Sequence, residues 1–233
     1  MIYVVGQYYK AALRFLKKAN TLYKTTFMHK MIIKIDGVRD GDTIRAISSL
    51  GANWIGLTFN AESPNNIDMI PIHTGIMPDK ADLSALHSPL STPKRVGIFT
   101  DEMPQNIITR AVNYKLDFIQ FDGTETPTLL RNLRHTLNPD ICKGIQFIKN
   151  LQHQGKYLPY EDCTDFFIIT LNMIDDYHSQ HPFLVSGFTP DDAARIGNIK
   201  HPQFAGISLE DAFDKEPGKK DISLIESFLG KLI

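Results

Sequence analysis

A lysine and an aspartate lie two positions apart at the end of a short apolar run. Met31–Ile33 leads into Lys34 and Asp36, and Gly37 follows. Because alternate residues of a β-strand point to the same face, Lys34 and Asp36 share a face if the run is a strand. Such a pair suits proton transfer, with Asp36 as a general base whose charge and orientation Lys34 maintains. The alternative is a buried ion pair that has no chemical role, and the spacing alone leaves both open.

This strand is one of eight that the sequence predicts from residue 31 onward, alternating with amphipathic segments. Several of the runs are almost entirely apolar, which is typical of a parallel sheet covered by helices. The strands are expected at Met31–Asp36, Trp54–Phe59, Arg95–Phe99, Asp117–Phe121, Cys142–Phe147, Asp165–Thr170, Phe183–Ser186 and Phe204–Leu209. The helices are expected at Asp42–Leu50, Pro104–Asn113, Pro127–Leu137, Asp191–Ile196 and Asp221–Leu232.

The alternation predicts an α/β protein, a (β/α)8 TIM barrel. An open doubly wound sheet is the alternative, but its Gly-x-Gly-x-x-Gly fingerprint is absent after the first strand. Two connections are unlike the rest. Residues 61–94 are punctuated by proline and have a weak helical pattern, and residues 171–181 are short and polar. We therefore expect irregular or missing helices after strands two and six.

The first thirty residues differ from the remainder of the chain. They carry six lysine and arginine residues and no acidic residue. A basic amphipathic helix there could be a targeting segment or a membrane-surface helix. It could equally be an extension from an upstream start, since Met28 and Met31 both precede the first strand. The expected organisation is a basic N-terminal extension over residues 1–30 and a single barrel domain over residues 31–233.

Composition excludes several classes of function. Hydrophobic residues make up 42% of the chain, charged residues 22%, and the net charge is −1, so nothing global favours nucleic-acid binding. Cys142 and Cys163 have neither metal-ligand nor redox spacing, which favours a reducing, cytoplasmic location. No apolar run approaches the roughly 18 residues of a membrane span.

In a TIM barrel, the residues that end each strand meet at one face, and that face carries function. A metal held by Asp36 and Asp122 lacks the support of any histidine-rich spacing, so no metal is expected. The stretch SGFTPDD suits a phosphate at its exposed backbone N–H groups, or is a plain turn capped by Thr189 with Pro190 in the first helical position. The strand-end positions are Asp36, Asn60, Thr100, Asp101, Asp122, Gly123, Thr170, Asn172, Ser186, Gly187, Glu210 and Asp211.

Five stretches resemble one family in order and spacing. KIDGVRDGDTIRAISSLGANWIGLTF resembles the opening of phosphoribosylanthranilate isomerase, which has Lys-x-Cys-Gly, a helix and Gly-Ala-Asp-x-x-Gly-Phe-x-Phe. KRVGIFTDEMPQNI and LDFIQFDGTE resemble its third and fourth strands. FLVSGFTPDDAARI resembles its Leu-Ser-Gly-Gly-Leu-x-Pro-x-Asn-Val segment, and EPGKKDISLIESFL its closing Pro-Gly-x-Lys-Asp and helix. The resemblance covers nearly all of residues 31–233.

The resemblance implies a (β/α)8 barrel in tryptophan biosynthesis that performs an Amadori rearrangement of N-(5-phosphoribosyl)anthranilate. It implies no metal or organic cofactor, a phosphorylated sugar–aryl amine as substrate, and a monomer or homodimer. In the family, a Cys ending strand one is the base at sugar C2, and an Asp ending strand six is the acid on the ring oxygen. Backbone N–H groups after strands seven and eight hold the phosphate.

The departures from the family pattern fall at these working positions. Asp36 replaces the catalytic Cys, and Thr170 replaces the strand-six Asp, so Asp122 or Asp175 becomes the candidate acid. A carboxylate can serve as a base, whereas a Thr hydroxyl is far too weak an acid. The substrate-binding positions then fall at Lys34, Asn66 (or Asn65, where the family has Arg), Gly187, Glu210, Asp211 and Ala212.

Two carboxylates near a phosphate would repel it by roughly 1 kcal/mol or more each at ~4 Å in water. Three alternatives therefore follow from the sequence. The protein is a working isomerase with Asp36 as base, a family barrel that acts on a less phosphorylated or cationic ligand, or a non-catalytic paralogue that serves as a binding protein.

Overall fold

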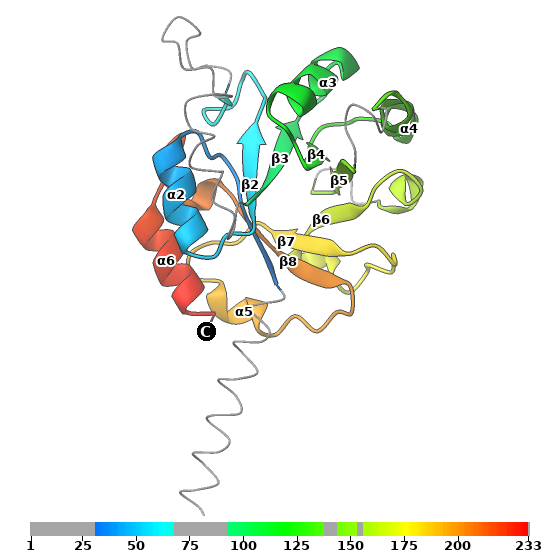
Figure 1. Ribbon diagram of the computed structural model, residues 1–233. Coiled ribbons are helices and arrows are strands. Elements are labelled where there is room, and N and C mark those ends of the chain that lie inside the picture. Colours follow the sequence, from blue (N-terminus) through cyan, green and yellow to red (C-terminus); the bar gives the residue numbers. More distant parts are fainter. Residues whose placement is uncertain (1–30, 68–92, 138–143, 153–155, 233) are drawn as a thin grey trace, which may run out of the picture.

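The computed structural model describes residues 31–67, 93–137, 144–152 and 156–232. Eight parallel strands close into a barrel in chain order, with β1 paired to both β2 and β8 (Figure 1). The TIM barrel expected from the sequence is thus confirmed. The strands are β1 (Ile32–Ile35), β2 (Trp54–Thr58), β3 (Lys94–Phe99), β4 (Phe118–Phe121), β5 (Gln146–Asn150), β6 (Phe166–Thr170), β7 (Phe183–Ser186) and β8 (Phe204–Leu209).

Helices cover the outside of the barrel, and local sequence signals set their ends. Asp40 caps the first described helix by accepting a hydrogen bond from Thr43 N at 2.8 Å. Thr126 and Asp221 cap two others in the same way. Figure 1 shows the last helix of the chain lying beside that first one, so the two ends of the domain pack together. The helices are α2 (Gly41–Ser49), α3 (Pro104–Asn113), α4 (Pro127–Thr136), α5 (Ala193–Ile196) and α6 (Ile222–Gly230).

The connection between β6 and β7 contains no full helix, as the sequence predicted. It holds the short 3₁₀ helix η5 (Leu171–Met173), and Tyr177 covers the outer face of the strands instead. The Tyr177 ring lies 4.7 Å from that of Phe183, and its hydroxyl donates to the His181 carbonyl at 2.8 Å. One large aromatic side chain therefore takes much of the place of a helix. After β2, the residues up to Ile67 form turns, and the rest of the 61–94 prediction lies mostly outside the described residues.

Two apolar cores stabilise the barrel. The larger lies between the strands and the helices, and includes Ile35, Phe121 and Phe228. The smaller fills the barrel interior with Trp54, Val96, Ile98, Phe118, Ile148, Ile168 and Leu184. The interior core fills the amino-terminal half of the barrel, so the site can only open at the carboxyl ends of the strands.

Two local predictions were wrong. The fifth strand was expected at Cys142–Phe147 but runs over Gln146–Asn150. The prediction failed because Lys149 is buried on the outer face in an ion pair, and a search for apolar residues does not recognise a charged residue as part of a buried strand. The fifth helix was expected to begin near Asp191 with Thr189 as its cap. It begins at Ala193, and Thr189 instead donates its N–H and its hydroxyl to the Asp192 carboxylate at 2.8 and 2.7 Å.

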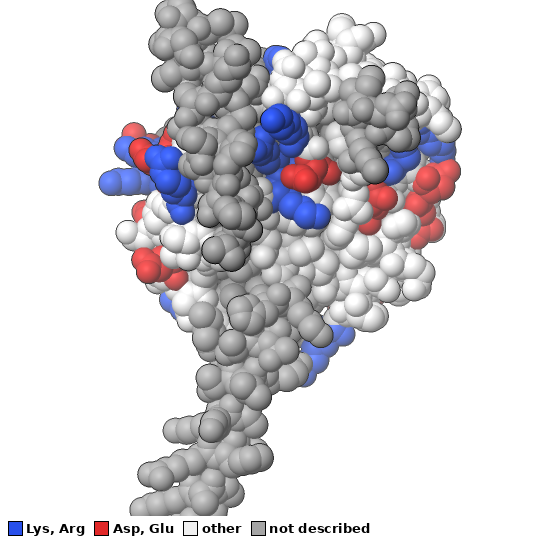
Figure 2. All heavy atoms as spheres, in the orientation of Figure 1, with Lys and Arg blue, Asp and Glu red and all other residues white. Residues whose placement is uncertain are grey.

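The expected basic helix within residues 1–30 lies outside the described residues. Within the described part of the chain, no helix is both long and apolar enough to cross a lipid bilayer. Figure 2 shows basic and acidic side chains interspersed over the described surface of one face.

Candidate active site

Polar side chains gather inside the barrel at the carboxyl ends of its strands. Register pairs such as Lys34–Ser208 and Thr170–Ser186 place residues of the same parity on the inner face. The even-numbered residues of β1–β7 point inward, and so do those of β8 from Gly206 onward, because a register shift turns Phe204 toward the outer core. The inward residues change from apolar to polar toward the carboxyl ends. The inward residues at that end, called the mouth below, are Asp36, Thr58, Asp122, Asn150, Thr170, Ser186 and Glu210.

Asp36 is held at the mouth by a buried network. The Lys34 ammonium contacts both carboxylate oxygens of Asp36, and Lys34 is fully buried while Asp36 is 7% exposed. The Ser208 hydroxyl lies 3.2 Å from Lys34 Nζ and 3.1 Å from Asp36 Oδ2. Gly56 makes room for the carboxylate, because a methyl group at that position would overlap Asp36 Oδ1. The base predicted from the sequence is therefore placed at the mouth with its ammonium partner.

Asp122 ends strand four at the same mouth. Gln120 Nε2 donates to Asp122 Oδ1 at 2.8 Å. Burial raises the pKa of the Asp122 carboxyl above its ordinary 3.8, against the hydrogen bonds from Gln120 and Asn150 and the charge of Lys34. The expected carboxyl pair of Asp36 and Asp122 thus shares one site, and their charges interact. Within the described residues, no group of three or more His, Cys, Asp or Glu side chains is placed to hold a metal.

Glu210 adds a third carboxyl to the mouth, from the end of strand eight. The Asp36 N–H donates to the Leu209 carbonyl at 2.9 Å, so Glu210 is next to Asp36 on the neighbouring strand. Gln152, which follows strand five, donates to the Ser186 hydroxyl and lies 3.5 Å from Glu210 Oε1. Burial raises the pKa of Glu210 from 4.5 to about 7, and the negative charge of Asp36 contributes to the rise.

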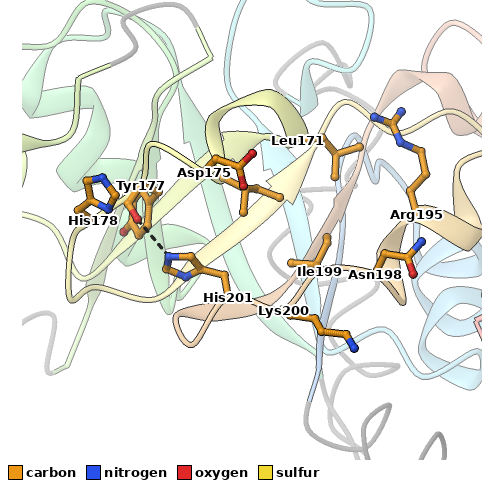
Figure 3. A pocket seen from close by; sticks show the side chains of 10 residues that line it. Leu171, Asp175, Tyr177, His178, Arg195, Asn198, Ile199, Lys200 and His201 are labelled. Atoms are coloured by element: carbon orange, nitrogen blue, oxygen red, sulfur yellow. Dashed lines mark hydrogen bonds between the residues drawn. The ribbon is translucent and has the colours of Figure 1, made fainter.

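The strand-six position offers no acid. The Thr170 hydroxyl donates a hydrogen bond to Asn172 Oδ1. The two residues at the position of the family's strand-six carboxyl are therefore bonded to each other. Asp175 lies elsewhere, in a pocket of about 640 Å³ on the outside of the barrel. Figure 3 shows that pocket between the β6–β7 connection and the segment after α5, with Arg195 and Lys200 on its other side. Asp175 therefore does not share the mouth with Asp36.

The loop after strand two closes over the strand-eight end. Asn65 Nδ2 donates to Asp211 Oδ1 at 2.8 Å, and Asn65 is 4% exposed. Asn66 is equally buried and pairs with Thr58. Asp211 and Ala212 begin the short 3₁₀ helix η6 (Asp211–Phe213). An Asn–Asp contact thus occupies the region where the sequence predicted substrate-binding residues.

The strand-seven turn contains a glycine in the left-handed region and carries a carboxylate. Gly187 has φ +75°, which favours glycine. The Asp192 carboxylate already accepts the Thr189 N–H of this turn. The hydrogen bond from Arg195, with those from Thr189, lowers the pKa of Asp192 to about 2, so it stays ionised. A phosphate near this turn would meet that negative charge.

Other polar residues at the strand ends brace loops. Asp101 accepts from Thr124 N at 2.7 Å and from its hydroxyl at 2.9 Å, beside Gly123. Asn60 accepts from Glu62 N at 3.0 Å. Thr100 is exposed at the end of strand three.

The sequence interpretation missed four residues that shape the site. These are Ser208, Gln120, Asn150 and Gln152. Extending the alternation two positions back from Glu210 and Asp122 would have found Ser208 and Gln120. Asn150 and Gln152 were missed because strand five was expected to end at Phe147 and ends at Asn150. A fifth residue, Lys149, was missed for another reason: it faces outward and is buried. Its ammonium donates to Glu125 Oε2 at 3.0 Å and to the Gly123 carbonyl at 2.6 Å. That ion pair fixes the loop after strand four.

Cys163 is no substitute for the family's catalytic Cys. It is buried in the outer core, and burial raises the pKa of its thiol to about 11, so the reactive thiolate is scarce near neutral pH. Cys142 lies outside the described residues.

Comparison with known proteins decides the family. The N-(5'-phosphoribosyl)anthranilate isomerase of Parabacteroides distasonis is 30% identical over 223 residues, which cover 87% of this chain and 94% of the relative. The chain belongs to the phosphoribosylanthranilate isomerase family. The isomerase of Phocaeicola vulgatus is similar at 29% identity, with 87% of this chain and 98% of the relative covered. No family model matches the sequence.

Solved structures of the family share the fold. The phosphoribosylanthranilate isomerase of Thermus thermophilus aligns with a TM-score of 0.67 at 16% identity, covering 87% of this chain and 98% of that chain. A phosphoribosylanthranilate isomerase in complex with reduced 1-(o-carboxyphenylamino)-1-deoxyribulose 5-phosphate aligns with a TM-score of 0.64 at 21% identity, covering 87% of this chain and 98% of that one. At these identities the structural likeness supports the barrel itself.

Proposed function

We propose that the protein isomerises N-(5-phosphoribosyl)anthranilate in tryptophan biosynthesis, with Asp36 as the general base. The observation that carries the proposal is the Asp36 carboxylate at the mouth, held by Lys34 and Ser208. It lies at the strand-one position where the family resemblance puts the base. A carboxylate paired with an ammonium stays ionised and oriented, which a base requires.

The reaction needs proton transfers and no external oxidant. The ring oxygen gains a proton as its bond to C1 breaks, and the nitrogen lone pair forms an iminium. Asp36 then removes the proton from C2, and the C2–H electron pair forms the C1=C2 bond of an enolamine. Return of a proton to C1 and loss of the O2 proton give the ketose. Hydrogen moves within the substrate through the protein's carboxyl groups, and the residues at the mouth are of the types that this requires.

A second candidate is a family barrel that binds a cationic or less phosphorylated ligand. Asp211 and Asp192 favour it, because both place negative charge in the regions where the family resemblance expects phosphate binding. This candidate and the isomerase differ in what they bind. An isomerase site retains affinity for a sugar phosphate carrying an aryl amine, whereas the second candidate does not.

Rescue of a tryptophan auxotroph that lacks the isomerase tests the proposal in cells. We expect growth without tryptophan from the wild-type chain and none from Asp36→Asn. Calorimetry with the reduced product analogue provides the matching binding test. Absence of both growth and binding contradicts the isomerase and leaves the second candidate.

The cellular setting is part of the same proposal. We place the protein in the cytoplasm, working as a monomer or homodimer, on a small-molecule substrate and without nucleic acid or membrane contact by the barrel. A dimeric isomerase of this family is known from Thermotoga maritima. The substrate contacts of Lys34, Asn66, Gly187, Glu210, Asp211 and Ala212 remain predictions. In the structure, the Lys34 ammonium donates its hydrogen bonds to Asp36.

A further inference from the structure

The proposed isomerisation needs a proton donor as well as a base. The family places a carboxylic acid at the end of strand six, where this chain has Thr170. The Thr170 hydroxyl is bonded to Asn172 and is far too weak an acid to protonate a sugar ring oxygen. The donor must therefore come from another strand.

The mouth contains three carboxyls in the described part of the chain, and their surroundings differ. Asp36 contacts the Lys34 ammonium with both carboxylate oxygens. Burial raises the pKa of Asp122, but Asp122 accepts from Gln120 at 2.8 Å and interacts with Asn150, and these amide donors oppose the rise. Glu210 accepts one long hydrogen bond, from Gln152 Nε2 at 3.5 Å, and Gln152 also donates to the Ser186 hydroxyl.

We propose that Glu210 at the end of strand eight is the general acid of this barrel and replaces the missing carboxyl of strand six. The proposal rests on the proposed isomerase function and names a residue of the same mouth. The neighbouring strand carries Asp36, so acid and base come from adjacent strands of the barrel. The Lys220 ammonium lies 3.3 Å from the Glu210 carbonyl and fixes the backbone that carries the acid.

Burial and, after it, the charges that face Glu210 explain why it keeps a proton. Asp36 and Asp122 face Glu210 and raise its pKa, and Lys34 faces it from strand one and lowers it. The effect of Asp36 is larger than the opposing effect of Lys34, which contacts Asp36. Burial and these neighbours raise the pKa of Glu210 to about 7, where a group can both donate and recover a proton near neutral pH.

The proton steps balance. Glu210 gives its proton to the ring oxygen as the C1–O bond breaks, and the bond's electron pair goes to that oxygen. Asp36 takes the C2 proton, and the resulting enolamine returns to the ketone form as the O2 proton passes to Glu210 and the Asp36 proton passes to C1. Both carboxyls end in their starting states.

The test is the pH profile of purified protein with phosphoribosylanthranilate. In the wild type, kcat/KM should fall tenfold per pH unit above a pH of about 7 as Glu210 loses its proton. Glu210→Gln should lower kcat by about 10²–10⁴-fold, the range for a lost general acid, and should abolish that alkaline limb. Glu226→Gln makes the same chemical change at an exposed position of α6 and should leave both unchanged.

Infrared spectroscopy of the free protein provides a readout that does not need turnover. A protonated carboxyl signal that disappears above about pH 7 in the wild type should be absent from Glu210→Gln and present in Asp122→Asn. Loss of the signal and of the alkaline limb in Asp122→Asn instead would assign the acid to Asp122 and overturn the proposal. Wild-type turnover that persists unchanged in Glu210→Gln overturns it while the isomerase stands. A wild-type protein that neither turns over nor binds the product analogue removes the isomerase function, and the assignment of Glu210 as its acid with it.

Discussion

Replacing Lys34 by methionine should strongly destabilise the barrel. The Lys34 side chain is 0% exposed and that of Asp36 is 10% exposed, so the substitution leaves a buried carboxylate without its counter-charge. Removing one partner of a buried ion pair costs about 3–5 kcal/mol in unfolding free energy. For a domain of this size, each kcal/mol lowers Tm by about 2–4 °C, so Tm should fall by about 6–20 °C. Urea titration and a thermal melt measure both quantities.

The double variant Lys34→Met/Asp36→Leu separates charge from packing. Replacing a whole buried pair by apolar residues of similar volume is often neutral or stabilising, so the double variant should recover most of the loss. Lys219→Met is the control, since it removes an exposed pair with Glu216 at 4.0 Å, which is worth about 0–1 kcal/mol. If Lys34→Met costs no more than this control, or if the double variant is less stable than the single one, the buried-pair reasoning is wrong.

Three further predictions concern the mouth. Gly56→Ala should push the Asp36 carboxylate out of place and lower kcat by about a hundredfold, because a displacement of ~1 Å costs that much. Gly230→Ala is the control: a methyl group there would meet no atom within 4 Å, and kcat should not change. Between pH 4.5 and about 7 the folded state holds a Glu210 proton that the unfolded chain has lost, so stability falls as pH rises. Denaturant titrations should therefore show the wild type losing on the order of 3 kcal/mol relative to Glu210→Gln across that window. Thr170→Asp in the Glu210→Gln background should raise kcat at least about tenfold, because it returns a carboxyl to strand six. If kcat does not rise, the end of strand six is not a position from which a carboxyl can act as the acid in this barrel.

The strand alternation was predictable because burial imposes it. A barrel interior requires alternate residues to face inward, and this pattern placed Asp36 and Lys34 together before any coordinates. Extending the same parity by two residues would have added Gln120 and Ser208, whereas Gln152 follows a strand whose end was not predicted correctly. The family resemblance added the roles, which the pattern alone could not supply.

The remaining features depend on contacts between distant residues. Asn65 and Asp211 are 146 positions apart, and no local pattern predicts their hydrogen bond. The shift of strand five arises because Lys149 finds a buried partner in Glu125, a charge pairing that hydrophobicity cannot show. The raised pKa of Glu210 likewise results from its burial and from the charge of Asp36, a residue distant in the sequence.

Turnover of phosphoribosylanthranilate by purified protein tests the central claim most directly. Loss of anthranilate-type fluorescence gives kcat/KM for the wild type, Asp36→Asn and Asp36→Cys. We predict wild-type turnover that falls at least about a hundredfold in Asp36→Asn and persists in Asp36→Cys, which restores the family's base beside the Lys34 ammonium. Wild-type protein without turnover, or Asp36→Asn as active as the wild type, would contradict the assignment of Asp36 as the base.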